Sequence, residues 1–258
     1  MSKTPIVFLM YHELALPGRP IYQNEPGYVR YVLDHSDFES QIEHLKANGW
    51  QGLSVGSSLA YPEGRYVAIT FDDGCETDLL AAAPILRQAE FGATFFITTG
   101  KLGTPGYLSS AQLRALSALG FEIGCHSMTH PYLNDLDEKG LHTEIVEAKY
   151  RLEQITGKIV EHFSCPGGRY NQLVLKMARN AGYSSVCTSR IHANTEHTNR
   201  FALGRIAMLR DVPLRTFDRI CQGRTLSRMR AKAMLREAAR RVLGNSLYDR
   251  IRTGALHP

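Results

Sequence analysis

The chain has 258 residues, of which 43% are hydrophobic, and both values are typical of one soluble globular domain with a substantial core. The apolar run before His12 is about six residues long, too short for the core of a signal peptide or for a membrane span. The five cysteines show no CxxC spacing, which indicates reduced thiols rather than a disulfide framework or a zinc ribbon. We therefore expect a cytoplasmic protein.

The net charge of +5 is concentrated near the C-terminus. Between Arg219 and Arg252 there are ten Lys and Arg residues but only two acids, a local charge of +8, so the rest of the chain sums to about −3. We place a boundary at this change of composition. It separates a main domain, residues 1–215, from a basic helical extension, residues 216–258.

Short β-rich segments alternate with helical patterns along the main domain. We predict strands at residues 6–11, 66–71, 93–98, 121–125, 161–164 and 184–188. We predict helices at residues 37–48, 77–90, 109–119, 135–156 and 172–180, with Ser36 as the N-cap of the first. This alternation predicts an α/β fold with a parallel sheet, as either an open doubly wound sheet or a barrel.

Polar side chains follow three of these predicted strands. Asp72 and Asp73 come directly after residues 66–71, His126 follows residues 121–125, and the segment S-C-P-G-G-R-Y (164–170) ends a third strand. Both fold alternatives place chemistry at the carboxyl ends of parallel strands. We therefore expect these three segments to meet at one face.

The histidines at 126 and 130 are spaced so that both can reach one metal ion. If the residues between them form a single turn, His126 and His130 converge, and a carboxylate from Asp72 or Asp73 would complete a two-His, one-carboxylate site. Such a site keeps positions open for water and substrate, as catalytic metal sites do. Taken separately, the histidine pair also fits two surface histidines, and D-D-G also fits a solvated turn.

The order of these motifs is more specific than any of them alone. T-F-D-D-G (70–74), H-S-M-T-H (126–130) and a later Pro-Gly loop after a strand together resemble the polysaccharide deacetylase family, also called the NodB homology family. The resemblance covers roughly residues 5–210. It implies a distorted (β/α) barrel with about seven parallel strands, a catalytic domain in residues 1–215, and one divalent metal, usually Zn²⁺. It also implies hydrolysis of an N-acetyl, or sometimes an O-acetyl, group on a sugar.

The resemblance assigns different roles to the two adjacent acids. Asp73 would be a metal ligand together with His126 and His130, and Asp72 would be the general base that takes a proton from a water molecule on the metal. Amide hydrolysis needs both functions, because water is a poor nucleophile and an amide carbonyl a poor electrophile.

Three motifs of the family are altered in this chain, and the fourth, usually an Asp and a Trp, has no match in residues 182–190. The third motif has an Arg that orients the base, but Ser164 stands there, and we name Arg169 as the candidate replacement; an ordinary surface Arg is the alternative. The fifth motif provides a His as general acid, but G-R-I-A-M (204–208) places Met208 there. His12, at the end of the first strand, is the candidate substitute, and a partly buried structural histidine is the alternative.

The extension contains a basic amphipathic pattern over residues 227–243. Its apolar positions are Ala231, Met234, Leu235, Ala238 and Val242, and its basic ladder is Arg228, Lys232, Arg236 and Arg240. Such a helix can lie on an anionic membrane or pack on the domain with a solvated face. Nucleic-acid binding is disfavoured, because the helix has no interleaved aromatic residues and the rest of the chain is net acidic.

The resemblance to this family, together with the motifs above, implies a metal-dependent carbohydrate deacetylase, a hydrolase of carbon–nitrogen bonds other than peptide bonds, in bacterial cell-envelope or exopolysaccharide biosynthesis. The expected partner is an N-acetylated saccharide, for instance a lipid-linked or nucleotide-linked precursor, with peripheral contact at the inner face of the membrane. One alternative is deformylation of a polyprenyl-phosphate sugar. Another is a non-catalytic saccharide-binding protein that retains the fold.

Overall fold

The computed structural model describes residues 4–22, 25–61 and 63–243. A parallel sheet is its centre, and its main strands follow the order β10-β1-β5-β6-β7-β8-β9, with β4 also paired to β5. The strands are β1 (Val7–Tyr11), β4 (Gln51–Leu53), β5 (Tyr66–Phe71), β6 (Thr94–Ile97), β7 (Glu122–Cys125), β8 (His162–Ser164), β9 (Ser185–Cys187) and β10 (Ile206–Ala207). A separate parallel pair consists of β2 (Leu14–Ala15) and β3 (Leu33–Asp34).

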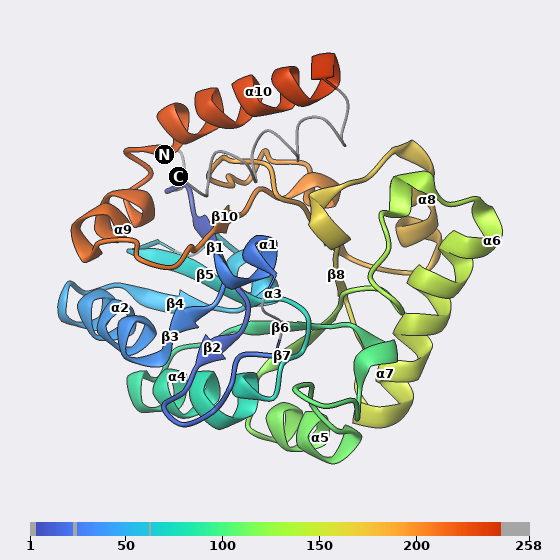
Figure 1. The fold of residues 1–258 in the computed structure, drawn as a ribbon, viewed down its shortest axis with the longest axis horizontal. Helices are drawn as coiled ribbons and strands as arrows, with labels where there is room; N and C mark the ends of the chain where they lie inside the picture. The colour runs from blue at the N-terminus through green and yellow to red at the C-terminus, as the bar shows by residue number, and fades with distance from the viewer. Residues whose placement is uncertain (1–3, 23–24, 62, 244–258) are drawn as a thin grey trace.

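The sheet curls into a distorted barrel, as predicted (Figure 1). An isolated parallel bridge between Cys187 and Leu203 links β9 to the segment that leads into β10, the strand at the other end of the order. The barrel therefore brings the two ends of the strand order close together. Seven parallel strands lie along this path. Strands β4 and β6 pair with the same edge of β5: β4 pairs with the first residues of β5 and β6 with the last.

Helices surround the curled sheet (Figure 1). They are α1 (Pro26–Val29), α2 (His35–Ala47), α3 (Val55–Ser58), α4 (Ala83–Ala89), α5 (Ser110–Ala118), α6 (Glu138–Leu141), α7 (Ala148–Thr156), α8 (Gln172–Asn180), α9 (Leu214–Cys221) and α10 (Leu226–Leu243). Local sequence explains several starts. Ser109 and Gln112 form a capping box at α5, and the Asn171 side chain accepts a hydrogen bond from Val174 N at α8. No helix in the described part of the chain is long and apolar enough to span a bilayer.

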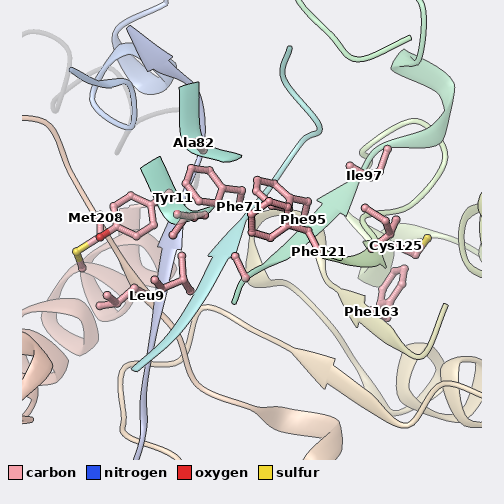
Figure 2. Packing of buried hydrophobic residues seen from close by; sticks show 14 of the residues in the cluster. Leu9, Tyr11, Phe71, Ala82, Phe95, Ile97, Phe121, Cys125, Phe163 and Met208 are labelled. Atoms are coloured by element: carbon pink, nitrogen blue, oxygen red, sulfur yellow. The ribbon is translucent and has the colours of Figure 1, made fainter. Parts of the chain in front are cut away.

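The sheet packs on its helices through a ladder of aromatic rings (Figure 2). Tyr11, Phe71 and Phe95 occupy matched positions on β1, β5 and β6. Their ring centroids are 5.2 Å apart between Tyr11 and Phe71 and 5.0 Å apart between Phe71 and Phe95, with Phe121 a further 5.3 Å from Phe95. Such cross-strand aromatic pairs stabilise a fixed register. Because Phe71 directly precedes Asp72, the ladder also fixes where the strand-end acids begin.

Most predicted elements are present, but three predictions need correction. The helix predicted at 135–156 begins at Glu138, after its N-cap Asp137, and continues to Thr156 with a π-helical stretch, His142–Glu147, between α6 and α7. The N-cap of α2 is Asp34 rather than Ser36. The short strands β4 and β10 were not predicted.

The segment after the predicted boundary packs on the barrel. Phe217, Ile220 and Cys221 of α9, and Leu226 at the start of α10, are buried in the same hydrophobic cluster as the sheet. Farther along α10, 60% of Met234 is exposed. The side chains of residues 235–243 and all of residues 244–258 lie outside the described residues, so the rest of the predicted apolar face and basic ladder cannot be compared with the structure.

The five cysteines are free and buried, and burial raises the pKa of Cys125 and Cys187 to about 12. Burial also raises the pKa of the other three thiols. A raised pKa keeps a thiol protonated and unreactive at pH 8. We expect iodoacetamide to modify none of the cysteines in the native protein at pH 8 and all five in guanidinium chloride, as counted by mass spectrometry. Rapid modification of the native protein would contradict this burial.

Candidate metal and catalytic site

The predicted strand-end residues do meet at one end of the barrel. Asp72 and Asp73 follow β5, His126 follows β7, and Ser164 is the last residue of β8. Because the strands are parallel neighbours, their carboxyl ends lie on the same side of the sheet. A further residue, Arg205, reaches these side chains from just before β10.

Asp73, His126 and His130 form a compact group of possible metal ligands. One ligand atom from each residue lies within 4.8 Å of the other two. Asp73 Oδ1 is 3.7 Å from His126 Nε2 and 3.4 Å from His130 Nε2, and the two imidazole centroids are 4.9 Å apart. These distances are those of groups gathered around a shared point rather than bonded directly to one another.

The donor atoms of this group suit a divalent cation. His126 Nδ1 lies 2.9 Å from the Ser164 carbonyl oxygen, so it carries the proton and leaves the Nε2 lone pair free. Burial lowers the pKa of His126 to about 4, although both acids act against this, so the imidazole is neutral near pH 7. Asp73 Oδ1 is buried and accepts no hydrogen bond in the described part of the chain. Two imidazoles and one carboxylate of this kind fit Zn²⁺.

A buried acid from the helices around the sheet holds the turn that carries the two histidines. Glu144, in the π-helical stretch, accepts hydrogen bonds of 2.8 Å from the backbone N–H groups of Met128 and Thr129, and a third from Thr129 Oγ1. Within the turn, His130 N donates to Ser127 Oγ at 3.0 Å. Ser127 and His130 have positive φ angles of 69° and 66°, a conformation that such residues adopt only when their surroundings impose it.

Asp72 is paired with a guanidinium, and that guanidinium belongs to Arg205. Arg205 Nη1 donates to Asp72 Oδ1 at 2.6 Å and Nη2 to Oδ2 at 2.8 Å, in a bidentate pair with both residues almost fully buried. Arg205 also donates to Thr70 Oγ1, Ser164 Oγ and the Thr188 carbonyl. Burial acts to raise the pKa of Asp72, but Arg205 and then His126 outweigh it and hold the pKa below its usual value.

Arg169 does not occupy the position that we predicted for it. Its guanidinium lies over the Tyr132 ring, with the carbon atom 3.9 Å from the centroid. Arg205 instead provides the orienting guanidinium, and the small side chain of Ser164 accepts a hydrogen bond from it at 2.6 Å. Arg205 thus replaces the arginine that is missing from the third motif. It comes from the segment before β10, at the other end of the strand order from β8, and not from the loop after β8 that carries Arg169.

His12 lies close enough to the two acids for both to raise its pKa, but burial dominates and lowers it overall. Its ring is 4.9 Å from that of Tyr31, and its Nδ1 atom is buried without a hydrogen-bond partner among the described residues. Met208, the residue at the expected general-acid position, is buried in the hydrophobic cluster near Tyr11 (Figure 2). Met208 therefore cannot take part in proton transfer.

Sequence reasoning missed two residues of this site. Arg205 lies within the G-R-I-A-M segment that we compared with the fifth motif, and an Arg next to an apolar strand was the available signal. Glu144 had no signal, because one more acid in a helical pattern is typical of a solvated face. Its role depends on a tertiary contact with the histidine turn.

The chain is similar to known proteins both in sequence and in fold. The sequence profile of the polysaccharide deacetylase family matches residues 60–186. The Bacillus subtilis protein YxkH is 28% identical over 211 residues, which are 80% of this chain and 71% of that protein. The peptidoglycan-N-acetylglucosamine deacetylase of Bacillus cereus is 34% identical over 126 residues, 48% of this chain and 57% of that enzyme.

A similar fold is found in the Streptococcus pyogenes deacetylase PplD, solved in complex with acetate. The TM-score is 0.76 at 23% identity, over 86% of this chain and 99% of that one. The two proteins share a curled parallel-sheet fold, and in this chain two acids and two histidines lie at one end of that sheet. The chain belongs to the polysaccharide deacetylase family.

We expect Arg205→Met to lower the free energy of unfolding by about 3–5 kcal/mol, because it leaves the buried Asp72 carboxylate unpaired. Arg169→Met is the matched control and should cost less than about 1 kcal/mol, since it removes only a stack on a tyrosine. Urea titrations of both variants provide the comparison. Adding Asp72→Asn to Arg205→Met should restore part of the loss, and equal losses in the two single variants would contradict the assignment.

Glu144→Ala should weaken metal binding by about 10–100-fold, because the histidine turn loses the carboxylate that accepts its two N–H groups. Glu147→Ala is the matched control, since Glu147 lies on the same stretch but its side chain is 53% exposed and contacts only His142 among the described residues. Competition with a chelating dye measures both affinities. If Glu144→Ala binds metal as tightly as Glu147→Ala does, Glu144 does not hold the turn.

Proposed function

We propose that the protein is a metal-dependent hydrolase that removes the acetyl group from an N-acetylated sugar of the bacterial cell envelope. The main observation behind this proposal is that two adjacent buried carboxylates have different partners. Asp72 is paired with Arg205, whereas Asp73 faces His126 and His130. Family membership and the similarity to a peptidoglycan-N-acetylglucosamine deacetylase support the reaction class.

In this mechanism Asp73, His126 and His130 would hold one Zn²⁺ ion. When bound, such a cation lowers the pKa of water and polarises the carbonyl group of the substrate. Asp72 then takes a proton from the attacking water molecule. Arg205 keeps Asp72 ionised and fixes its orientation through two hydrogen bonds, so the base is ready at neutral pH.

We assign proton delivery to the leaving amine to His12. Three observations support this choice: Met208 is buried in the core, both acids act to raise the pKa of His12, and its Nδ1 atom has no partner among the described residues. His12 follows β1, whose carboxyl end lies beside that of β5. Because burial lowers the pKa of His12, its imidazole is mainly neutral near pH 7. It would first accept the proton that Asp72 takes from water and then pass that proton to the leaving amine from the neighbouring strand.

A non-catalytic saccharide-binding protein is the second candidate considered from the sequence. Its support was the absence of the third-motif arginine and of the fifth-motif histidine. The Asp72–Arg205 pair answers the first absence, because the base still has a guanidinium partner, whereas Met208 still stands in place of the histidine. A binding protein gains nothing from a buried ion pair beside a cluster of metal-ligand residues, since burying both charges costs several kcal/mol before their attraction offsets it. The geometry therefore favours an enzyme.

We also keep as a proposal that the C-terminal helix contacts an anionic membrane. Arg228, Arg230 and Lys232 are exposed on α10, and Met234 is an exposed apolar residue beside them. Lys and Arg near an anionic leaflet contribute roughly 1 kcal/mol each, so the attachment would be reversible and sensitive to salt. This would hold the barrel near a lipid-linked sugar.

The test is release of acetate from a panel of N-acetylated sugars by the zinc-loaded protein. Asp72→Asn should keep its metal but lose about 10²–10⁴-fold in turnover, because general-base catalysis has that size. Asp73→Asn and His126→Ala should lose metal, measured by elemental analysis, and turnover together. Wild-type turnover in Asp72→Asn would rule out its role as the base, and full metal content in His126→Ala would rule out the metal site.

A further inference from the structure

Each of the two adjacent acids has a cation beside it, but the two pairs differ in their contacts. Arg205 donates two hydrogen bonds to Asp72, at 2.6 and 2.8 Å. The cation beside Asp73 is Lys101, whose Nζ atom is 4.0 Å from Asp73 Oδ1, too far for a hydrogen bond. Because Asp73 Oδ1 accepts no hydrogen bond among the described residues, its lone pairs stay available to another partner.

The backbone of Lys101 is fixed beside the metal-ligand group. Lys101 ends a short 3₁₀ turn after β6, and Thr98, just before this turn, donates from its N–H to the Asp73 carbonyl at 3.3 Å. Gly100 N donates to the Met128 carbonyl of the histidine turn at 2.8 Å. An added Cβ atom at Gly100 would lie 2.5 Å from that carbonyl oxygen, so this close approach requires glycine. The segments that carry the metal ligands therefore also position Lys101.

The Lys101 side chain lies over an aromatic ring and faces one acid. Its Nζ atom is 4.8 Å from the centroid of the Tyr107 ring. In the part of the chain that the structure describes, Asp73 is the only carboxylate within 4.0 Å of it. Burial acts to lower the pKa of Lys101, but Asp73 outweighs it and raises the pKa, so the ammonium is charged at neutral pH. Since 27% of the side chain is exposed, the ammonium can also reach solvent.

A cation at this place has opposite effects on the metal-free and the metal-bound site. Without a metal, Lys101 offsets the charge of Asp73, a carboxylate that is costly to bury alone. Once Asp73 holds a divalent ion, the same ammonium repels that ion. Asp73 can exchange Lys101 for a metal without losing a hydrogen bond, whereas Asp72 would lose two from Arg205. The contacts therefore favour Asp73 over Asp72 as the metal ligand.

We infer that Lys101 is a placeholder for the metal, which compensates Asp73 in the metal-free protein and is displaced from it when the metal binds. Lys101 acts through Asp73, so it is a positioning residue. The inference rests on the metal site of the proposed function and does not depend on the reaction. Removal of this lysine should strengthen metal binding, whereas removal of a lysine that only braced the loop would weaken it.

Zinc affinities measured by competition with a chelating dye, in the absence of any sugar, test this inference. Lys101→Met and Lys101→Gln should each bind zinc about tenfold more tightly than the wild type, since repulsion between a unit charge and a nearby divalent ion is of that size. Lys101→Arg keeps the charge and should bind zinc as the wild type does. Lys149→Met is the matched control and should change nothing, because Lys149 also lies 4.8 Å from a tyrosine ring, that of Tyr183, but pairs with Glu153.

Thermal unfolding gives a second measure of the same effect. Without zinc, Lys101→Met should have a lower Tm than Lys101→Arg, because Asp73 lacks its cation, and added zinc should raise the Tm of Lys101→Met by more.

Zinc affinities of Lys101→Met and Lys101→Gln at or below that of the wild type would overturn the inference, and so would equal tightening in Lys101→Arg. If either result occurs while His126→Ala still abolishes zinc binding, the proposed metal site stands and only the role of Lys101 fails. If neither the wild type nor any variant binds zinc, the metal site and the inference fail together.

Discussion

The ion pair between Asp72 and Arg205 has almost no access to water, since 2% of one residue and 1% of the other are exposed. Burying two charges costs several kcal/mol each unless their geometry and remaining hydrogen bonds are satisfied. Here Nη1 and Nη2 of Arg205 each donate to one carboxylate oxygen of Asp72. The remaining N–H groups of Arg205 donate to Thr70 Oγ1, Ser164 Oγ and the Thr188 carbonyl oxygen. The pair thereby joins β5, β8 and the segments beside β9 and β10 across the barrel. The metal-ligand residues are arranged around this fixed centre.

A single backbone feature lets two adjacent acids serve one site. In a regular strand successive side chains point to opposite faces, so Asp72 and Asp73 should not share one. Asp73 instead has φ +81°, followed by Gly74 at the same value, and the alternation ends there. Both acids consequently bring an oxygen within 3.7 Å of His126 Nε2. The strain at a non-glycine residue in this conformation is the cost of placing two carboxylates together.

The sequence predicted most of the fold because periodicity and end signals are local. Strand 66–71 and helix 172–180 match the structure residue for residue. The strands β4 and β10 are three and two residues long and defined by pairing with β5 and β1, so no local pattern marks them. The helix predicted at 135–156 begins three residues later, at Glu138, because Asp137 is its N-cap. The π-helical stretch within it keeps a helical pattern, so the sequence did not reveal it.

The difference between local signals and contacts between distant segments also explains which site residues were predicted. His126 and His130 were predicted because they lie four residues apart after a strand, and Asp73 because T-F-D-D-G resembles a motif of the family; the structure brings the three together. We predicted correctly that an arginine would pair with Asp72, but we named Arg169 and the structure shows Arg205. The sequence alone does not distinguish Arg205 from Arg169 as the partner of Asp72. The curling of the sheet brings the guanidinium of Arg205 to the carboxylate, whereas Arg169 stacks on Tyr132. Glu144 likewise acts through a turn that is distant in sequence.

The entry of Arg205 from just before the last strand has a consequence for the order of assembly. A ribosome delivers β5 through β9 first, and with them both acids and both histidines, but the guanidinium for Asp72 comes only with the segment that leads into β10. Until that segment docks against β1, Asp72 lacks its compensating charge, and a closed barrel interior would have to hold it protonated or hydrated. The nascent chain is therefore expected to stay open and loosely packed until its final strand emerges, so that closure of the barrel and completion of the catalytic centre become one event.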